Sequence, residues 1–194
     1  MDMDMARPLS DAKRNAILAT ATSAIAASGL AASTKAIARD ASVGEGTLFV
    51  YFPTKDDLFC ELYLELKADL TRAIAADYPK NEDVQTRLKH LWDHFVGWGL
   101  KNPEKRDALR RLAVSEKVSQ VKDHAEDETC ASMASMIQAD LSSGLLRVQP
   151  IEFLAGTIQA LGDMVTEMIA RDRAKADEYL DLGWDTLWGA ISAR

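Results

Sequence analysis

Apolar residues recur along this chain at intervals of three and four, and this spacing limits the available folds more than any other feature. Such intervals place apolar side chains on one face of an α-helix, whereas a half-buried strand alternates apolar and polar residues. No run of β-branched residues bounded by turn residues interrupts the pattern. The sequence therefore predicts an all-α protein.

Capping and helix-breaking residues divide the pattern into separate helices. Ser10 is a candidate amino-terminal cap, Gly29 a candidate carboxyl-terminal cap, and Thr54 with Asp57 resembles a capping box. Residues 115–121 are expected to hold a turn. Helices are predicted over about 10–29, 33–40, 44–51, 54–77 and 84–102. One further helix follows Pro103, another ends at Gly144, and two final helices carry residues 151–168 and 180–191.

Charge is distributed unevenly. The 194 residues include 23 Lys and Arg against 30 Asp and Glu, a formal net charge of -7, which argues against a protein covered in cationic surface. Residues 6–55 nevertheless hold six basic and three acidic side chains, while the remainder is acidic. Any contact with nucleic acid is therefore expected in the amino-terminal part alone.

Several protein classes are disfavoured by what the sequence lacks. No apolar run approaches the roughly 20 residues of a membrane-spanning helix, and MDMDMARPLS does not resemble a secretory signal, so we expect a cytoplasmic protein without membrane contact. Cys60 and Cys130 have no cysteine neighbours, so neither a metal knuckle nor a disulfide framework is indicated. No phosphate-binding glycine loop, nucleophile elbow or HExxH motif occurs, so we expect neither enzymatic activity nor a cofactor.

Residues 33–59, STKAIARDASVGEGTLFVYFPTKDDLF, carry the most informative pattern. Two short helices are joined by the turn DASVG, with Ile37, Val43 and Leu48 predicted to face inward, as in a helix-turn-helix. Leu48, Phe49 and Phe52 are expected to belong to the core. This spacing predicts a helix-turn-helix.

The same stretch closely resembles the amino-terminal domain of the TetR/AcrR family of transcriptional regulators. The resemblance covers about residues 10–60 and rests on Val43, Gly46-Thr47-Leu48-Phe49, Tyr51-Phe52 and Lys55. It implies a ligand-responsive homodimeric regulator, most often a repressor, that binds a near-palindromic operator and is released by a small effector. The expected division is a tail over 1–9, a helix-turn-helix domain over 10–54 and an effector-binding and dimerisation domain over 55–194.

Eight residues are expected to contact double-stranded DNA. Thr34, Thr47, Tyr51 and Lys55 provide hydroxyl groups and a cation for phosphates. Base reading is assigned to the exposed start of the recognition helix and to one apolar position, namely Ser42, Gly44, Glu45 and Val50.

Gly44, Glu45 and Val50 depart from the family pattern, which often has Ser, a basic residue and His at these positions. Because a carboxylate cannot bind phosphate favourably, Glu45 either accepts a hydrogen bond from cytosine, repels wrong sites, or is simply solvated.

Large apolar side chains in the second part of the chain are candidates for an effector pocket, although composition alone favours ordinary core packing. The family resemblance favours a pocket for a hydrophobic molecule. The candidate residues are Trp92, Phe95, Trp98, Met133, Met136, Met164 and Met168.

The two carboxyl-terminal helices are apolar on more than one side, which favours a homodimer interface built as a four-helix bundle over a buried hairpin.

His90, Asp93 and His94 share a helical face at a spacing that could hold a metal, but no third ligand is evident and no metal site is expected. The alternative function is an all-helical metal-binding or adaptor protein in which the helix-turn-helix is merely structural.

Overall fold

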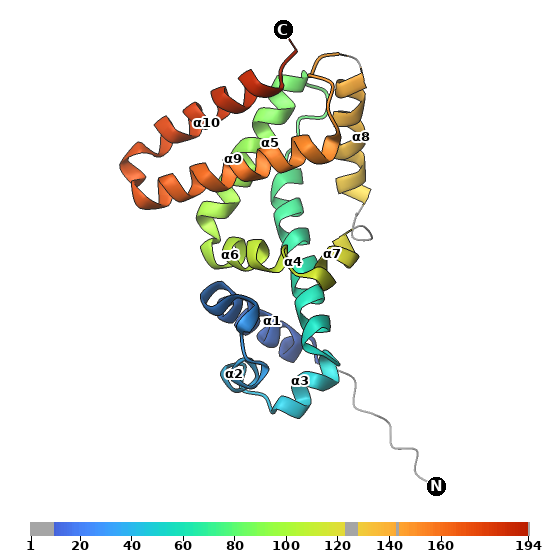
Figure 1. The fold of residues 1–194 in the computed structure, drawn as a ribbon, viewed down its shortest axis with the longest axis vertical. Helices are drawn as coiled ribbons and strands as arrows, with labels where there is room; N and C mark the ends of the chain where they lie inside the picture. Colours follow the sequence, from blue (N-terminus) through green and yellow to red (C-terminus); the bar gives the residue numbers. More distant parts are fainter. Residues whose placement is uncertain (1–9, 123–127, 143, 194) are drawn as a thin grey trace. The chain divides into compact units, whose positions relative to one another are not determined.

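The protein is all-helical, as predicted. The structure is a computed structural model that describes residues 10–122, 128–142 and 144–193. In these ranges, the only β-type pairing is an isolated bridge between Leu146 and Ser192. The α-helices of the described residues, shown in Figure 1, are α1 (Asp11–Ser28), α2 (Thr34–Asp40), α3 (Glu45–Tyr51), α4 (Lys55–Ala75), α5 (Val84–Lys101), α6 (Pro103–Leu112), α7 (Glu116–Lys122), α8 (Glu128–Ser142), α9 (Ile151–Arg171) and α10 (Ala176–Ile191).

Side-chain caps and glycine set several helix boundaries where the sequence predicts them. Gly29 ends α1 with a φ of 63°, a conformation that glycine adopts without the strain of a Cβ. The Thr54 backbone N–H donates to the Asp57 carboxylate at 3.0 Å, and the Asp57 N–H donates to Thr54 Oγ1 at 3.1 Å. This reciprocal pair is the predicted capping box, and it fixes the start of α4.

The chain divides into two compact units. One contains the described residues within 1–67 and 104–125, and the other those within 68–103 and 126–194. Helix α4 begins in the first unit and ends in the second. The buried apolar residues form two separate clusters that follow this division, so each unit has a core of its own.

The first unit contains the helix-turn-helix. Ile37 and Leu48 are fully buried, and the Val43 N–H donates to the Ala38 carbonyl at 2.9 Å across the turn between α2 and α3. Ser42 has a positive φ of 58°, which lets the chain reverse direction within this short connection. The core therefore holds the two helices in the arrangement that the apolar spacing predicts.

The prediction of a turn over 115–121 is wrong, because α7 (Glu116–Lys122) occupies this stretch. Val118 is fully buried in the core of the first unit, and the Ser119 N–H donates to the Ser115 carbonyl at 2.9 Å. Helical geometry lets this short, mainly polar segment bury Val118 while its backbone groups remain bonded.

The second unit is organised around Trp92, which is fully buried. Figure 1 shows α9 and α10 side by side as an antiparallel pair, and both helices pack on α5. The Trp92 ring fits because Gly183 lacks a Cβ, which would lie 2.6 Å from Trp92. Gly162 makes room for Phe95 in the same way, since a Cβ there would lie 2.6 Å from the Phe95 ring. The Trp92 Nε1–H donates to the Leu180 carbonyl at 3.2 Å, which satisfies its buried donor.

A buried ion pair joins α5 to α8 in the same unit. Arg87 donates to the Asp140 carboxylate, and both side chains are 12% exposed. The bond to Asp140 raises the pKa of Arg87, so Arg87 keeps its positive charge.

Within the described ranges, no helix combines the length and hydropathy needed to cross a membrane.

Candidate nucleic-acid interface and ligand cavities

Helix α3 buries one side and exposes the other. Leu48 is fully buried and Phe52, just after the helix, is 2% exposed, whereas Val50 is 63% exposed. The expectation that Phe49 belongs to the core is wrong, since it is 38% exposed. Leu48 and Phe52 are four residues apart and form the buried stripe, and successive residues point about 100° apart, so Phe49 turns away from it.

The predicted base-reading residues lie at the exposed amino-terminal end of α3. Gly44 is the cap residue of the helix, and Glu45 occupies its first turn. Ser42, Gly44, Glu45 and Val50 are all exposed. These four residues therefore do not belong to the buried core that packs against the other side of α3.

Tyr51 is tied to the start of α1. Its hydroxyl oxygen accepts a hydrogen bond from the Ser10 backbone N–H at 2.8 Å. Because the oxygen is the acceptor in this bond, the hydroxyl proton is left for a second partner. Thr47 lies one turn earlier on the same helix and, like Tyr51, is half-buried.

Lys55 is held at the amino terminus of α4. Its ammonium group donates to the Leu30 carbonyl at 2.8 Å and lies 5.2 Å from the centre of the Phe59 ring. An ammonium group has three donors, and the bond to Leu30 uses one of them. The first turn of a helix also carries a partial positive charge, which adds to the attraction for an anion at this place.

Thr34 forms a side-chain hydrogen bond with Glu45. The Thr34 hydroxyl donates to the Glu45 carboxylate at 3.2 Å, which links the first residue of α2 to the first turn of α3. The cap of α2 is instead Ser33, whose Oγ accepts from the Ala36 N–H at 3.4 Å. The hydroxyl predicted to donate to a phosphate therefore donates to a carboxylate in this structure.

A single ion pair at the end of α2 perturbs two side chains. Arg39 donates to the Asp40 carboxylate at 2.7 Å, which lowers the pKa of Asp40 and raises that of Arg39. Both side chains are exposed, so this pair contributes little to stability.

The seven residues predicted to form an effector pocket do not gather around one cavity. Trp92 is fully buried, and Trp98 is 6% exposed with its Nε1–H bonded to Asp69 at 3.2 Å. Met136 and Met168 are half-buried, Met164 is 49% exposed, and the side chain of Met133 lies outside the described part of the chain. Of the six whose side chains the structure describes, Phe95 alone lines the apolar cavity described next.

This apolar cavity lies among α4, α5, α8 and α9 and has a volume of about 240 Å³. Sequence reasoning missed most of its walls, although Ile151, Leu154, Ala155 and Ile158 follow one helical stripe. Its described lining residues are Ile74, Leu91, Phe95, Ile137, Ile151, Leu154, Ala155, Ile158 and Gln159.

A second apolar groove, of about 680 Å³, lies on the outer faces of α9 and α10. Phe153, 65% exposed, and Met164 lie in it, together with Gly156, Ala160 and Ala190. Exposed aromatic and methionine side chains beside small residues are typical of surfaces that bind another helix.

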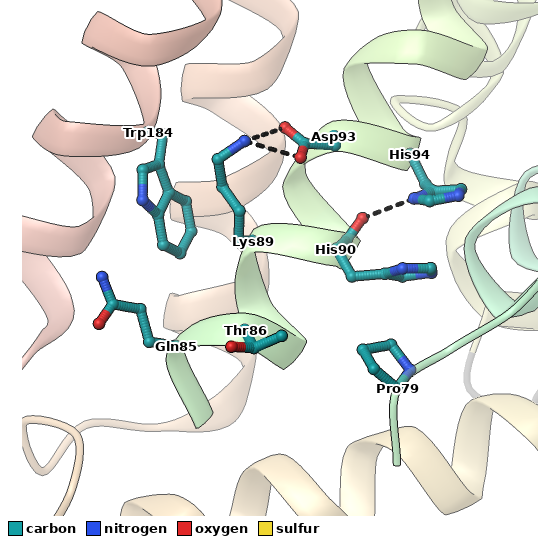
Figure 2. Close-up of a pocket in the computed structure, with 8 residues that line it drawn as sticks. All are labelled: Pro79, Gln85, Thr86, Lys89, His90, Asp93, His94 and Trp184. Carbon is teal, nitrogen blue, oxygen red and sulfur yellow. Dashed lines mark hydrogen bonds and ion pairs between the residues drawn. The ribbon is translucent and has the colours of Figure 1, made fainter. Parts of the chain in front are cut away.

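The face that carries His90, Asp93 and His94 forms a polar groove of about 440 Å³ (Figure 2). The carboxylate of Asp93 is paired with Lys89, and the two imidazole rings stack with their centres 3.8 Å apart. His90 Nε2 lies 2.9 Å from the Ile74 carbonyl. Among the described residues, no three His, Cys, Asp or Glu side chains are arranged to hold a metal ion.

Comparison with known proteins places the helix-turn-helix in a family. Residues 17–62 match the model of the bacterial regulatory proteins of the tetR family. These residues include the buried Ile37 and Leu48, the cap residue Gly44, and both Tyr51 and Lys55.

Solved structures extend the similarity to nearly the whole chain. A protein from Shewanella sp. PV-4, described as a tetR family transcription regulator, is 28% identical with a TM-score of 0.84, over 94% of this chain and 99% of that one. A TetR family transcription regulator from Marinobacter aquaeolei VT8 is 20% identical with a TM-score of 0.82, over 95% and 97%. A TetR-family transcriptional regulator from Haemophilus influenzae Rd is 17% identical with a TM-score of 0.75, over 94% and 99%.

The family consists of DNA-binding regulators rather than enzymes. The matched helix-turn-helix, its exposed recognition helix and the shared all-helical architecture lead to one conclusion: the chain belongs to the TetR family of transcriptional regulators.

Proposed function

We propose that the protein is a homodimeric repressor that binds a near-palindromic operator and leaves it when a small apolar effector binds. The observation that carries this proposal is the exposed start of α3, next to side chains that the core holds in place. Tyr51 and Lys55 are each fixed by one hydrogen bond and retain donors for a phosphate.

The eight proposed contacts divide into anchoring and reading groups. Thr47, Tyr51 and Lys55 anchor the protein to phosphates and have the same effect on every sequence. Ser42, Gly44 and Val50 meet base edges, with Val50 positioned for a thymine methyl group. The proposed domain roles remain DNA binding for 10–54, and effector binding and dimerisation for 55–194.

Thr34 and Glu45 act together in this proposal. The bond between them restricts the Glu45 side chain, so that its second carboxylate oxygen can accept a hydrogen bond from cytosine N4. Thr34 then contributes to base reading by orienting Glu45, and contacts phosphate only when this bond is broken.

A second copy of the chain is the proposed occupant of the groove on α9 and α10. Two antiparallel helices from each copy would form a four-helix bundle, the arrangement that their broad apolar faces favour. No other atom lies within 4 Å of a Cβ built at Gly156, so a partner helix has room to approach there.

Helix α4 gives the effector a route to the DNA-binding residues. Ile74 lines the apolar cavity, and Lys55 begins the same helix. An effector that prefers one position of Ile74 therefore biases the position of Lys55, and a coupling free energy of about 1 to 3 kcal/mol changes DNA affinity by roughly 5- to 150-fold.

The test starts by selecting bound fragments from random duplex DNA at a fixed salt concentration. With a selected duplex, Lys55→Ala should weaken binding to all sequences and reduce the slope of log K against log salt by about 0.9. Lys67→Ala removes the same charge farther along α4 and is the matched control. Glu45→Ala should relax the base preference at one position in each half-site. A uniform loss of affinity in both Lys55→Ala and Glu45→Ala would contradict the division of roles.

Oligomeric state tests the second part of the proposal. Phe153→Glu should convert the dimer into monomers in sedimentation experiments, because it places a charge in the apolar groove. Leu182→Glu, at a residue of α10 that is 58% exposed but does not line the groove, should leave the dimer intact. A wild-type protein that is monomeric at micromolar concentration would refute the dimer.

A further inference from the structure

The lining of the apolar cavity in the second unit indicates the chemistry of its ligand. We propose that the cavity binds a small, uncharged, mainly aliphatic molecule that carries one hydroxyl or carbonyl oxygen, and that Gln159 recognises this oxygen. This inference rests on the proposed effector function and specifies the class of effector.

The volume sets the size of the ligand. A cavity of about 150 Å³ holds benzene, which has six non-hydrogen atoms. By the same ratio, the cavity of about 240 Å³ accommodates roughly ten non-hydrogen atoms. This is below the range of about 300 to 1,000 Å³ that is typical of drug-sized ligands. Large polycyclic effectors are therefore disfavoured.

The shape of the walls favours an aliphatic ligand. Four isoleucines and two leucines line the cavity, and among the described lining residues Phe95 has the only aromatic ring. Phe95 has little freedom to reorient, because it packs where the missing side chain of Gly162 leaves space. Branched aliphatic side chains surround a flexible chain well but offer no pair of parallel rings between which a flat ligand could stack.

Charge is absent from the described lining of the cavity. Arg87 and Asp140 lie one helical turn from the wall residues Leu91 and Ile137, but they are paired with each other and offer no net charge. The sequence of 68–103 and 126–194 has 17 acidic and ten basic residues, so the surroundings also disfavour an anion. A carboxylate in the cavity would lose hydration without gaining a counter-ion.

Gln159 is the one polar side chain in the described lining. It lies on α9 one turn after Ala155, and both residues are exposed, so they mark the open side of the cavity. A carboxamide can donate to a carbonyl or hydroxyl oxygen and can also accept from a hydroxyl. An apolar chain inside the cavity with its oxygen at this opening matches the arrangement of the lining.

The test measures binding of 1-octanol and octanoate to the full-length protein by titration calorimetry near pH 7, without DNA. The wild type should bind 1-octanol at one site per chain and octanoate at least about tenfold more weakly. Gln159→Leu should weaken 1-octanol about fivefold, the effect of one hydrogen bond. Gln138→Leu, at an exposed glutamine of α8 outside the cavity lining, should bind like the wild type. Ala155→Trp should abolish binding by filling the opening.

Three results would overturn the inference: octanoate binding as tightly as 1-octanol, unchanged 1-octanol affinity in Gln159→Leu, or equal loss in Gln159→Leu and Gln138→Leu. Circular dichroism of each variant separates loss of binding from loss of fold. DNA release is measured separately. If 1-octanol binds as expected but leaves a selected duplex bound, the ligand class is supported and the proposed effector function fails. If octanoate binds more tightly and releases the duplex, the ligand class fails and effector control is supported.

Discussion

Gly183→Ala tests how tightly Trp92 is confined. A methyl group at this position would lie 2.6 Å from both Trp92 Cζ2 and Val165 Cγ2, well inside normal carbon contact distances. The Trp92 ring cannot retreat easily, because it is fully buried and its Nε1–H is bonded to Leu180. Overpacking of this kind costs up to about 3 kcal/mol. The higher helix propensity of alanine offsets about 1 kcal/mol, which leaves a net destabilisation of about 2 kcal/mol.

Thermal unfolding followed by circular dichroism measures this difference. A loss of about 2 kcal/mol lowers the midpoint by about 4 to 8 °C in a chain of this size. Gly97→Ala is the matched control, since no other atom lies within 4 Å of its added Cβ, and it should raise stability by about 1 kcal/mol. If Gly183→Ala unfolded at or above the midpoint of Gly97→Ala, the tight packing around Trp92 would be refuted.

Three further perturbations test other features. Arg87→Met removes the cation that neutralises Asp140 in the second unit and should cost about 3 kcal/mol in urea denaturation; a loss below about 1 kcal/mol would contradict a buried pair. Asp57→Ala removes the capping box of α4 and should cost about 1 kcal/mol, while Asp56→Ala, in the same first turn, should cost less. The Thr86 N–H donates to the Asp83 carboxylate and lowers the pKa of this carboxyl below its ordinary value of 3.8. The ionised carboxylate therefore stabilises the fold at a pH above its unfolded pKa, and this stabilisation is lost as the pH falls through its folded pKa. Asp83→Asn should therefore lose less stability than the wild type between about pH 5 and about pH 2, and equal losses would exclude this role.

Local signals explain why the first part of the fold is predictable from sequence. Gly29, Ser33 and the Thr54–Asp57 pair each act on residues within one turn, so their effect can be inferred without knowing the tertiary structure. The helix over 116–122 was not predictable in this way, because its central feature is the burial of Val118 against residues far away in the sequence.

The apolar cavity of the second unit shows the same limit more strongly. The large aromatic and methionine side chains that attract attention in the sequence serve different purposes: Trp92 and Trp98 fill the core, and Met164 faces the outer groove. A cavity forms where side chains from several helices fail to fill the space between them. Ile74, Ile137 and Ile158 line it together because of how α4, α8 and α9 are arranged, which a periodic pattern within one helix does not specify.

The bond between Thr34 and Glu45 has a consequence for how such a regulator acquires new targets. If Glu45 reads a base as proposed, replacing it by a neutral or basic residue would remove that contact and would also free the Thr34 hydroxyl to bind a DNA phosphate. A single codon change could thus relax sequence preference while strengthening general attachment, and later substitutions along α3 could establish a new preference from that intermediate. A change of DNA specificity in this protein would then pass through an intermediate that binds many DNA sequences, rather than through an intermediate that has lost affinity for DNA.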